Sequence, residues 1–384
     1  MPPRLAQSPL APEADPLATR DFAPDLVGCA QALRQACLDC GKCVSSCAFL
    51  QRHGSPGQVA EAWLTGRADP QTPFQCSLCG LCQAICPRGA RPTEFFQAWR
   101  EAVAGQGRDW RPYRGLLAYQ RWGARPVLSQ HHLPAGCQTV FFPGCSLPGA
   151  EPDLVWRTWR HLAQAEPSLG LVLDCCWRPS AYLGRREEHQ TGLARLLERL
   201  AAAGVRRIWV ACPNCLRSLG GAGGAGGELE VASVYQALAD LAPPAGGLPG
   251  AVSLHDPCVS RFDDDIQAAA RRLLGQAGLE LVELKASGRQ TICCGEGGGA
   301  GLVAPDLAKT WLERRRAALD TLPLVTYCAG CLLRYRRHGL DCRHLLAMTL
   351  APELAPLPVP SPPRAYLNRH RLVRRLRRWS ARQG

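Results

Sequence analysis

The sequence has no run of about twenty consecutive apolar residues, so it predicts no membrane-spanning helix. Its N-terminal segment MPPRLAQSPLAPEADPLATRDF has prolines and acidic residues where a secretory signal needs an apolar stretch, and we therefore expect a cytoplasmic protein. The chain also lacks any motif for binding flavin, haem or nicotinamide. The 21 cysteines are an odd number, which excludes complete disulfide pairing, and so many thiols in the cytoplasm indicate metal or redox chemistry.

Length and charge narrow the class of protein further. The 384 residues are enough for two or three domains, and 46% hydrophobic residues are enough for a core. The net charge is +13, but much of the excess lies in the last twenty residues, so the body of the chain is closer to neutral. A basic tail is a local feature, and we expect no nucleic-acid partner.

Two runs of four cysteines near the start of the chain have the spacing that holds cubic iron–sulfur clusters. A cubane takes four thiolates, and in tandem runs the fourth cysteine of each run binds the other cluster. The first predicted set of ligands is Cys37, Cys40, Cys43 and Cys86, and the second is Cys76, Cys79, Cys82 and Cys47. Zinc, which also accepts Cys-x2-Cys pairs, needs only four thiols and is the alternative interpretation.

Helical patterns surround these runs. Residues 59–64 lie between the runs, and residues 93–100 follow the second run and begin with a threonine as the expected cap. The sequence therefore predicts a helical ferredoxin domain over residues 29–105. We expect residues 1–28, which are rich in proline and alanine, to be disordered. We expect residues 106–136 to form an irregular connector.

The rest of the body shows an internal duplication. In each half a single cysteine is followed by an adjacent pair and then by Cys-x2-Cys. Matching cysteines of the two halves are 113, 118 and 116 residues apart in the sequence. The first copy has Cys145, Cys175, Cys176, Cys212 and Cys215, and the second has Cys258, Cys293, Cys294, Cys328 and Cys331. Five thiolates exceed what one zinc ion or one cubane uses, and adjacent cysteines can bridge neighbouring irons. Zinc held by four of the five thiols, in one half or in both, is the alternative.

Most of these cysteines directly follow a short apolar or β-branched run, which is typical of a buried parallel strand. Helical stretches at residues 192–203 and 265–275 lie between such runs. Each half thus predicts an α/β unit whose ligands lie at the carboxyl ends of strands. We expect a first repeat over residues 137–241, a linker over 242–250 and a second repeat over 251–350. The predicted fold class is an α-helical ferredoxin domain followed by two α/β cysteine-rich repeats.

A ferredoxin domain followed by two such repeats resembles the catalytic subunit of heterodisulfide reductase fused to its small ferredoxin subunit. It is also similar to the iron–sulfur subunits of glycolate oxidase and anaerobic glycerol-3-phosphate dehydrogenase. The resemblance covers roughly residues 29–350 and is carried by CGKC, CSLCGLCQAICP, DCC, ACPNC, HDPC, CCGEGGG and CAGC. It implies that each repeat, a CCG domain, holds a non-cubane 4Fe–4S cluster through its five cysteines. It also implies a pseudo-twofold axis between the repeats, with a substrate disulfide cleaved between the two clusters.

One residue departs from the family pattern, and two others are further candidates for the site. The family has glycine after the cysteine pair; the second copy keeps it as Gly295, whereas the first has Trp177, whose ring we expect to alter the cavity. Gly295 begins GEGGGAG, which lacks the ending and spacing of a phosphate loop, so its glycines are interpreted as letting the backbone pass close to a cluster. His255 is a candidate proton donor to a leaving thiolate, and a turn built on a hydrogen-bonded Asp256 is the alternative.

The C-terminal segment, residues 351–384, has a Pro-rich part followed by arginines around Leu372, Leu376 and Trp379 at helical spacing. It predicts either a basic amphipathic helix that lies on an anionic membrane surface or a partner, or a solvated, partly disordered tail. Three cysteines outside every motif are expected to be buried structural thiols: Cys29, Cys137 and Cys342.

We thus expect an iron–sulfur oxidoreductase subunit that passes electrons from two ferredoxin clusters to two repeat clusters, which reduce a small-molecule or protein disulfide or exchange with a thiol. A second hypothesis is the electron-transfer subunit of a flavin-dependent 2-hydroxyacid or glycerol-3-phosphate dehydrogenase. A third is a zinc-stabilised interaction protein. Both redox hypotheses require a flavoprotein or a membrane cytochrome as partner, because we expect no flavin or haem in this chain. Contact with such a partner or with lipid would place the protein on the cytoplasmic face of the membrane.

Overall fold

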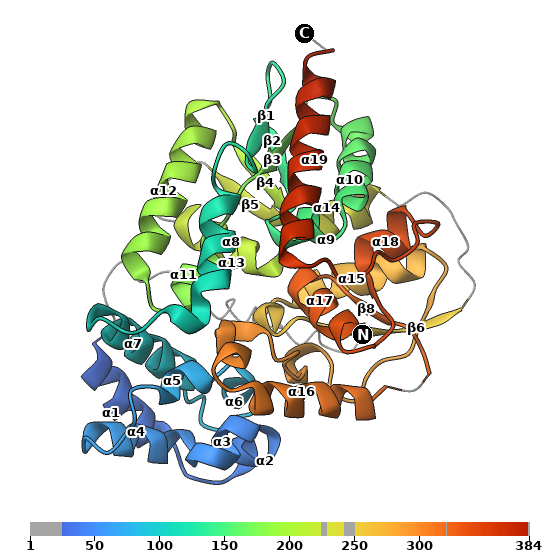
Figure 1. The fold of residues 1–384 in the computed structure, drawn as a ribbon. Coiled ribbons are helices and arrows are strands. Elements are labelled where there is room, and N and C mark those ends of the chain that lie inside the picture. The colour runs from blue at the N-terminus through green and yellow to red at the C-terminus, as the bar shows by residue number, and fades with distance from the viewer. Residues whose placement is uncertain (1–24, 224–228, 242–249, 320, 383–384) are drawn as a thin grey trace, which may run out of the picture.

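Short helices form the N-terminal domain, which lies at the bottom of Figure 1 in blue and teal. The computed structural model describes residues 25–223, 229–241, 250–319 and 321–382. The helices of this domain are α1 (Leu26–Ala36), α2 (Lys42–Ser46), α3 (Ala48–His53), α4 (Pro56–Leu64), α5 (Thr72–Gln75), α6 (Leu81–Ala84) and α7 (Pro92–Gly105). Buried aromatic side chains fill the space between them, among them Phe49 and Phe96, whose rings meet edge to face at 5.3 Å. The helical domain is as predicted.

Two details of the N-terminal domain differ from expectation. Helix α1 begins at Leu26, so the disordered segment predicted to end at residue 28 runs into a helix. The reason is that the Asp25 carboxylate accepts hydrogen bonds from the free amides of Val27 and Gly28. Helix α7 begins at Pro92 and Thr93 is not its cap, because the Thr93 hydroxyl donates to Gln83 Oε1 at 3.0 Å. Residues 1–24 lie outside the described part of the chain.

The predicted irregular connector is wrong. It contains η1 (Arg111–Tyr113), helix α8 (Arg114–Gly123) and strand β1 (Gln130–His132). Strand β1 pairs antiparallel with the remote strand β3 (Gly170–Leu173) at the edge of a sheet. Its sequence, QHH, has no apolar alternation, so only the tertiary pairing makes it a strand.

Two sheets of matching strand order form the rest of the body. The first has the order β1-β3-β2-β4-β5 and the second β7-β6-β8-β9, and every pairing except that of β1 is parallel. The further strands are β2 (Thr139–Phe142), β4 (Arg207–Val210), β5 (Glu230–Ser233), β6 (Ala251–His255), β7 (Glu280–Leu281), β8 (Leu324–Thr326) and β9 (Cys342–His344). Since β3-β2-β4-β5 matches β7-β6-β8-β9, the two α/β repeats predicted from the duplicated cysteines are confirmed.

The helices of the two repeats meet in pairs around one core. Those of the first repeat are α9 (Ser146–Ala150), α10 (Pro152–Ala165), α11 (Arg178–Tyr182), α12 (Arg186–Ala202), α13 (Pro213–Gly223) and α14 (Val234–Leu241). Those of the second are η2 (Cys258–Ser260), α15 (Asp264–Gln276), η3 (Gly288–Gln290), η4 (Gly297–Leu302), α16 (Pro305–Ala317), α17 (Ala329–Arg337) and α18 (Leu345–Leu350). By their place after matching strands, α10 corresponds to α15 and α14 corresponds to α18. Helix α14 packs on α15 and α10 packs on α18, so the two contacts are equivalent, as a pseudo-twofold axis requires. Leu162, Leu238, Leu273 and Leu346 from these helices are all fully buried in that core.

One run that was interpreted as a strand is not one. Thr291 and Ile292, which precede the second cysteine pair, follow η3 and belong to no sheet. Side chains hold this segment instead: the Thr291 hydroxyl donates to Asp256 O at 2.8 Å, and Arg261 Nη2 donates to Thr291 O at 2.6 Å. A backbone whose polar groups are satisfied in this way has no need of a strand partner.

The C-terminal segment forms helix α19 (Pro362–Ser380), drawn in red along the first repeat in Figure 1. Its apolar side packs against α9, α10 and β1, with Leu372, Val373 and Leu376 buried. The ring of Trp379 meets that of Trp159 edge to face at 4.8 Å. The predicted basic amphipathic helix is confirmed, and the alternative of a solvated, partly disordered tail is wrong. Much of its apolar side is covered by its own chain while Leu367 stays 44% exposed, and contact with a membrane or a partner stays a prediction.

The predicted linker, apart from its last residue, Gly250, lies outside the described residues. Among the helices that the structure describes, none combines the length and the apolar character needed to cross a membrane.

Candidate iron–sulfur sites

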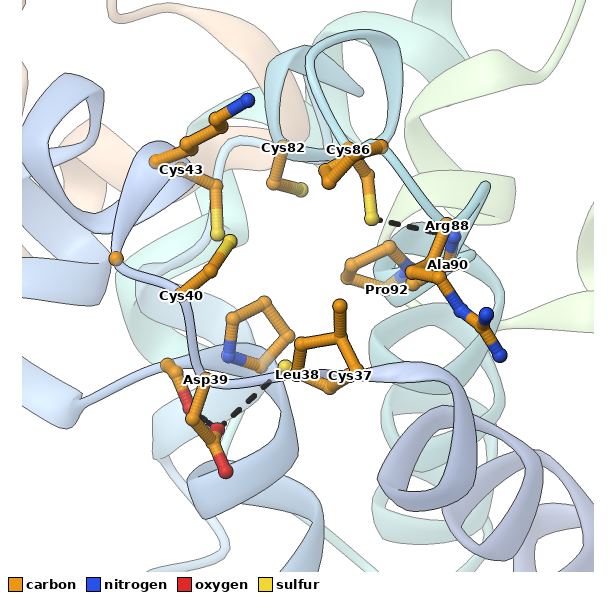
Figure 2. Close-up of a pocket in the computed structure, with 15 residues that line it drawn as sticks. Cys37, Leu38, Asp39, Cys40, Cys43, Cys82, Cys86, Arg88, Ala90 and Pro92 are labelled. Atoms are coloured by element: carbon orange, nitrogen blue, oxygen red, sulfur yellow. Dashed lines mark hydrogen bonds between the residues drawn. The ribbon is translucent and has the colours of Figure 1, made fainter.

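Five thiols surround one hollow in the N-terminal domain (Figure 2). Cys37 follows α1, Cys40 and Cys43 come from the loop and helix after it, and Cys82 and Cys86 come from α6 and the turn behind it. Burial raises the pKa of Cys43 to about 11, and the nearby thiols of Cys37, Cys86 and Cys40 add to this. The structure thus brings together the four thiols predicted for the first cubane. Cys82, which belongs to the second predicted set, lines the same hollow.

The second predicted set also converges. Burial raises the pKa of Cys47 to about 12, and the neighbouring Cys79 thiol adds to this. The pKa of Cys76 is raised by burial and by Cys79 and Cys47, and that of Cys82 is raised by burial and then by Cys76. Cys47 of the first run therefore lies with the second run, just as Cys86 lies with the first. Thiols so crowded and buried resist ionisation on their own, and a bound cation would stabilise their charged form.

Two buried arginines lie beside this second set. Arg100 from α7 donates to the carbonyl of Cys76, and Arg261 donates from Nε to the carbonyl of Cys79 at 2.9 Å. Burial lowers the pKa of Arg100 to about 10, so its guanidinium is still charged at neutral pH. Neither residue was predicted from the sequence, because nothing near them in the chain distinguishes them from other arginines.

The chemistry of the donors fits iron–sulfur clusters. Each set consists of sulfur alone, the donor type that iron–sulfur clusters take. Within the part of the chain that the structure describes, no group of three or more His, Cys, Asp or Glu side chains is arranged around a single metal ion.

In the first repeat, three strands deliver the thiols. Cys145, Cys175 and Cys212 follow the carboxyl ends of β2, β3 and β4, the edge at which α/β sheets place their sites. A hydrogen bond from Cys175 lowers the pKa of Cys145 to about 7, whereas the same bond raises that of Cys175. Cys215 is hydrogen-bonded to both Cys176 and Cys212. All five predicted thiols thus form one group.

The second repeat has the same arrangement. Cys258 follows β6 and Cys328 follows β8, while Cys331 lies in α17. The Cys331 thiol donates to the Cys294 sulfur at 3.3 Å, and Cys258 and Cys293 are hydrogen-bonded to each other. Hydrogen bonds from Cys293 and Cys331 lower the pKa of Cys294 to about 5. The five thiols of the second copy therefore also converge.

The groups of thiols touch one another in series. The Cys79 thiol of the ferredoxin domain is hydrogen-bonded to Cys293 of the second repeat. The Cys328 thiol of that repeat is hydrogen-bonded in turn to Cys212 of the first repeat. Cysteine spacing gives no sign of either contact, because each joins segments more than a hundred residues apart.

Trp177 adopts the backbone conformation of the glycine that it replaces. Its φ is 57°, in the left-handed region, as is that of Gly295 at 87°. The Trp177 ring lies against Gly192 of α12, where a Cβ atom would come within 2.2 Å of the ring. The ring is thus packed on α12, and its effect on a substrate cavity stays a prediction. Gly295 has its own constraint, since a Cβ there would lie 2.8 Å from the Ala308 carbonyl.

The Gly-rich loop after Gly295 packs on the ferredoxin domain. Gly298 has a φ of 60°, and a Cβ on it would lie 3.0 Å from Arg100 Nη1 and 3.2 Å from the Cys76 carbonyl. The backbone therefore passes close to a predicted cluster ligand, in keeping with the interpretation of these glycines. Whether Gly295 itself contacts a cofactor stays a prediction.

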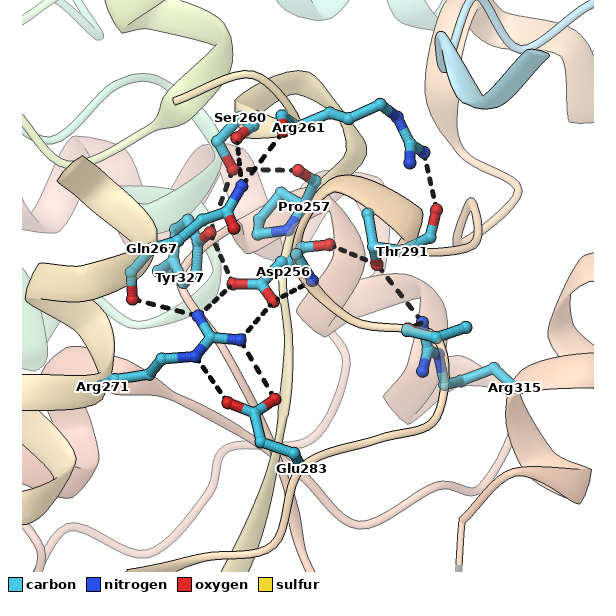
Figure 3. Close-up of polar contacts among 12 residues, drawn as sticks. Asp256, Pro257, Ser260, Arg261, Gln267, Arg271, Glu283, Thr291, Arg315 and Tyr327 are labelled. Atoms are coloured by element: carbon cyan, nitrogen blue, oxygen red, sulfur yellow. Dashed lines mark hydrogen bonds and ion pairs between the residues drawn. The ribbon is translucent and has the colours of Figure 1, made fainter. Parts of the chain in front are cut away.

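Asp256 is the centre of a hydrogen-bond network, drawn in Figure 3. Its carboxylate accepts from Arg271 at 2.9 and 3.1 Å, from the Tyr327 hydroxyl at 3.0 Å and from the Gly288 amide at 2.7 Å. His255 is fully buried beside Tyr335, and burial together with Arg315 and Arg261 holds its pKa well below the usual value. A histidine held neutral in this way is poorly suited to deliver a proton, and its role as an acid stays a prediction.

The three cysteines outside the motifs differ in burial. Cys137 and Cys342 are buried as expected, and the Cys137 thiol donates to Thr139 O at 3.2 Å. Cys29 lies in α1 and is only half-buried, because its helix faces solvent on that side.

Two protein-family models match the chain. A 4Fe-4S dicluster domain matches residues 36–91, and a cysteine-rich domain, CCG, matches twice, at residues 139–220 and 252–336. These ranges contain the eight cysteines of the ferredoxin runs and the ten of the repeats. The chain is therefore an iron–sulfur protein made of a 4Fe–4S dicluster domain and two cysteine-rich domains.

Relatives among characterised proteins are distant and cover most of the chain. A dihydromethanophenazine:CoB–CoM heterodisulfide reductase subunit of Methanosarcina barkeri is 26% identical over 284 residues, 64% of this chain and 67% of that protein. The Methanosarcina mazei protein of the same name is 24% identical over 83% of this chain and 91% of its own length. A fumarate reductase (CoM/CoB) subunit of Methanothermobacter marburgensis is 23% identical over 79% of this chain and 67% of that protein. The chain is thus distantly homologous to this heterodisulfide reductase subunit, which confirms the resemblance.

Proposed function

We propose that this chain is an electron-transfer subunit of an oxidoreductase complex and that its two repeat sites reduce a disulfide. The observation that carries the proposal is the series of touching thiol groups, with Cys79 against Cys293 and Cys328 against Cys212. Neighbouring clusters held by these thiols would form one path from the surface of the ferredoxin domain to the interface between the repeats. Distant homology to the heterodisulfide reductase subunits of two Methanosarcina species supports this activity.

The proposed ligands follow the four groups of thiols. The two cubanes take Cys37, Cys40, Cys43 and Cys86, and Cys47, Cys76, Cys79 and Cys82. The two repeat clusters, which we propose to be non-cubane 4Fe–4S clusters, take Cys145, Cys175, Cys176, Cys212 and Cys215, and Cys258, Cys293, Cys294, Cys328 and Cys331.

The reaction needs two electrons and two protons for each disulfide. Iron–sulfur clusters supply electrons one at a time, and two clusters at the repeat interface could supply the pair. The S–S bond of the substrate breaks, each sulfur takes one electron and one proton, and two thiols leave. We expect the protons to come from solvent. The electrons come from a partner, which we propose is a flavoprotein or a membrane cytochrome.

The test uses protein purified without oxygen. We expect about sixteen irons per chain, about eight from the cubanes and about eight from the repeats. With reduced methyl viologen as donor, the protein should consume the dye when bis(2-hydroxyethyl) disulfide is added. Replacement of Cys328 by serine should abolish this turnover. Cys137→Ser, which changes a buried thiol outside the motifs, should leave it unchanged.

Iron-replete protein that does not cleave this disulfide or oxidised glutathione would overturn the reductase activity. Protein that contains two to four zinc ions and little iron would favour a zinc-stabilised interaction protein over both redox functions.

A second candidate function is electron relay towards quinone. Trp177 in place of the motif glycine favours it, because the first repeat departs there from the pattern of the disulfide-cleaving family. EtfAB:quinone oxidoreductase of Syntrophomonas wolfei is 28% identical over 158 residues, 40% of this chain and 21% of that protein. Relay predicts that the reduced chain passes electrons to a partner flavoprotein or a quinone analogue but leaves disulfides intact.

A further inference from the structure

Four arginines of the described residues are fully buried and have no carboxylate partner among those residues. They are Arg100, Arg261, Arg315 and Arg369, and each is at most 1% exposed. None of them forms an ion pair with another residue of the described ranges. A guanidinium that is removed from water needs a compensating negative charge, because its desolvation is costly. Their burial therefore implies anions that lie elsewhere than on side-chain carboxylates.

Arg100 lies where three parts of the chain meet. Its guanidinium donates to the carbonyls of Pro73 at 3.0 Å, Tyr182 at 2.7 Å and Gly298 at 2.8 Å, and also to that of Cys76. These partners belong to the ferredoxin domain and to both repeats. Carbonyl oxygens satisfy the N–H groups, but they carry no net charge, so the positive charge of Arg100 is not neutralised by them.

Arg261 lies on the other side of the same group of thiols. Its Nε donates to the carbonyl of Cys79 at 2.9 Å, and its Nη2 donates to that of Thr291, two residues before Cys293. It thus lies between the second ferredoxin set and the second repeat. Its partners are again carbonyl oxygens alone, as at Arg100.

The surroundings of the first ferredoxin set are different. Cys40 is exposed, and the Cys37 thiol donates to the carboxylate of Asp39 at 3.5 Å. Lys42 and Arg88 are at the rim of the hollow, where solvent screens their charge. The first set thus has an exposed thiol and an acid nearby, while the second lies between two fully buried cations.

We propose that Arg100 and Arg261 are the counter-charges of the second cubane and that they raise its reduction potential. This inference rests on the cluster assignment of the proposed function. A cubane with four thiolates carries net negative charge and becomes more negative on reduction, and burial alone makes that step harder. The two guanidinium groups offset this cost, so that electron transfer from the exposed first cubane to the buried second one is not uphill.

The test is a redox titration of iron-replete protein followed by electron paramagnetic resonance. Arg100→Met and Arg261→Met should each lower the reduction potential of one cubane and leave the potential of the other unchanged. The double variant should lower the first of these potentials further. Arg100→Lys and Arg261→Lys keep the charge without the planar fork and should restore most of the potential. Arg195→Met, which removes an exposed arginine from α12, should shift neither cubane.

Every outcome decides the inference. Methionine variants with full iron content and unchanged potentials would overturn it while leaving the proposed function standing. If a methionine variant loses the second cubane, retention of that cubane by the matching lysine variant supports the role of charge, and its loss there too overturns it. Wild-type protein without iron would overturn the proposed function and this inference together.

Discussion

The two cysteine-rich repeats have the same strand order and the same layout of five thiols, but they have different neighbours. The second repeat lies against the ferredoxin domain, with Cys293 touching Cys79. The first repeat also contacts that domain, where Arg100 of α7 donates to Tyr182 O at 2.7 Å. At Cys145, however, it lies against α8 and α19: the Tyr119 hydroxyl donates to Cys145 O at 3.0 Å, and Arg369 lies near the Cys145 thiol. Duplication thus supplies two similar sites, and the segments before and after the duplicated region make them unequal.

The same inequality appears at the residue after each cysteine pair. Gly295 takes a left-handed conformation at little cost. A residue with a side chain is destabilised in that conformation by about 1–2 kcal/mol, and Trp177 is such a residue. The first repeat offers Gly192 to receive the ring, while Ala308 occupies the corresponding space in the second. Each repeat is therefore packed around its own residue, and exchange of the two residues should harm them unequally.

The largest expected effect concerns the order in which the two repeats receive electrons. Replacing Cys293 and Cys294 by alanine removes the second repeat cluster and interrupts the path, so the first repeat should stay oxidised while the cubanes become reduced. Replacing Cys175 and Cys176 removes only the terminal site, so the second repeat should be reduced as in the wild type. Freeze-quench electron paramagnetic resonance measures both, and each variant should lose about four irons.

Equal rates of reduction of the remaining repeat in the two double variants would contradict a serial path. Comparison of the iron content of each variant with that of wild-type protein ensures that the other clusters are in place.

A smaller effect is expected at the packing of Trp177 on Gly192. Gly192→Ala places a methyl group against the ring and should destabilise the protein by about 1–3 kcal/mol. In a Trp177→Gly background the same substitution should be neutral or slightly stabilising, since alanine favours a helix over glycine by about 1 kcal/mol. Urea unfolding of the four proteins gives the interaction energy.

The corresponding change in the second repeat has no such rescue. Gly295→Ala combines left-handed strain with the close approach to Ala308 O and should cost about 2–4 kcal/mol. Full stability of this variant would show that the two repeats are more alike than the packing indicates.

The smallest effect is a pH dependence that belongs to the first repeat. Burial, together with Arg178, lowers the pKa of His189 to about 4, while its Nδ1 lies 3.0 Å from Trp177 O. The folded chain keeps His189 neutral, whereas the unfolded chain protonates it below about pH 6.5, so stability is full above that pH and falls as the pH drops towards 4. The loss is about 2 kcal/mol between about pH 6.5 and 5.

Urea unfolding at several pH values between about 5 and 7 measures this slope. His189→Gln should flatten it, and His370→Gln on α19 is the matched control that should not. A slope unchanged by His189→Gln would show that other groups cause the acid sensitivity.

Cysteine spacing predicted the groups of thiols, including the exchange of Cys47 and Cys86 between the two ferredoxin sets, and the duplicated motif predicted the two α/β repeats. It could do so because cluster ligands recur with a fixed pattern of spacing, even where the ligands of one cluster are far apart in the chain. Strand β1 and the docking of α19 were not predicted, since QHH has no strand pattern and an arginine-rich amphipathic helix does not reveal what covers it. The strand expected before Cys293 was predicted wrongly, because Asp256 and Arg261 hold that segment from a distance.

The sequence by itself determined which thiols gather and that the five-thiol arrangement occurs twice, because cluster ligands recur in fixed spacing patterns that can be read from the chain. The tertiary structure alone decided that the groups touch in series and that Arg100 and Arg261 lie beside the second of them. Those contacts join segments far apart in the chain, and a lone arginine acquires its electrostatic role only when folding removes it from water.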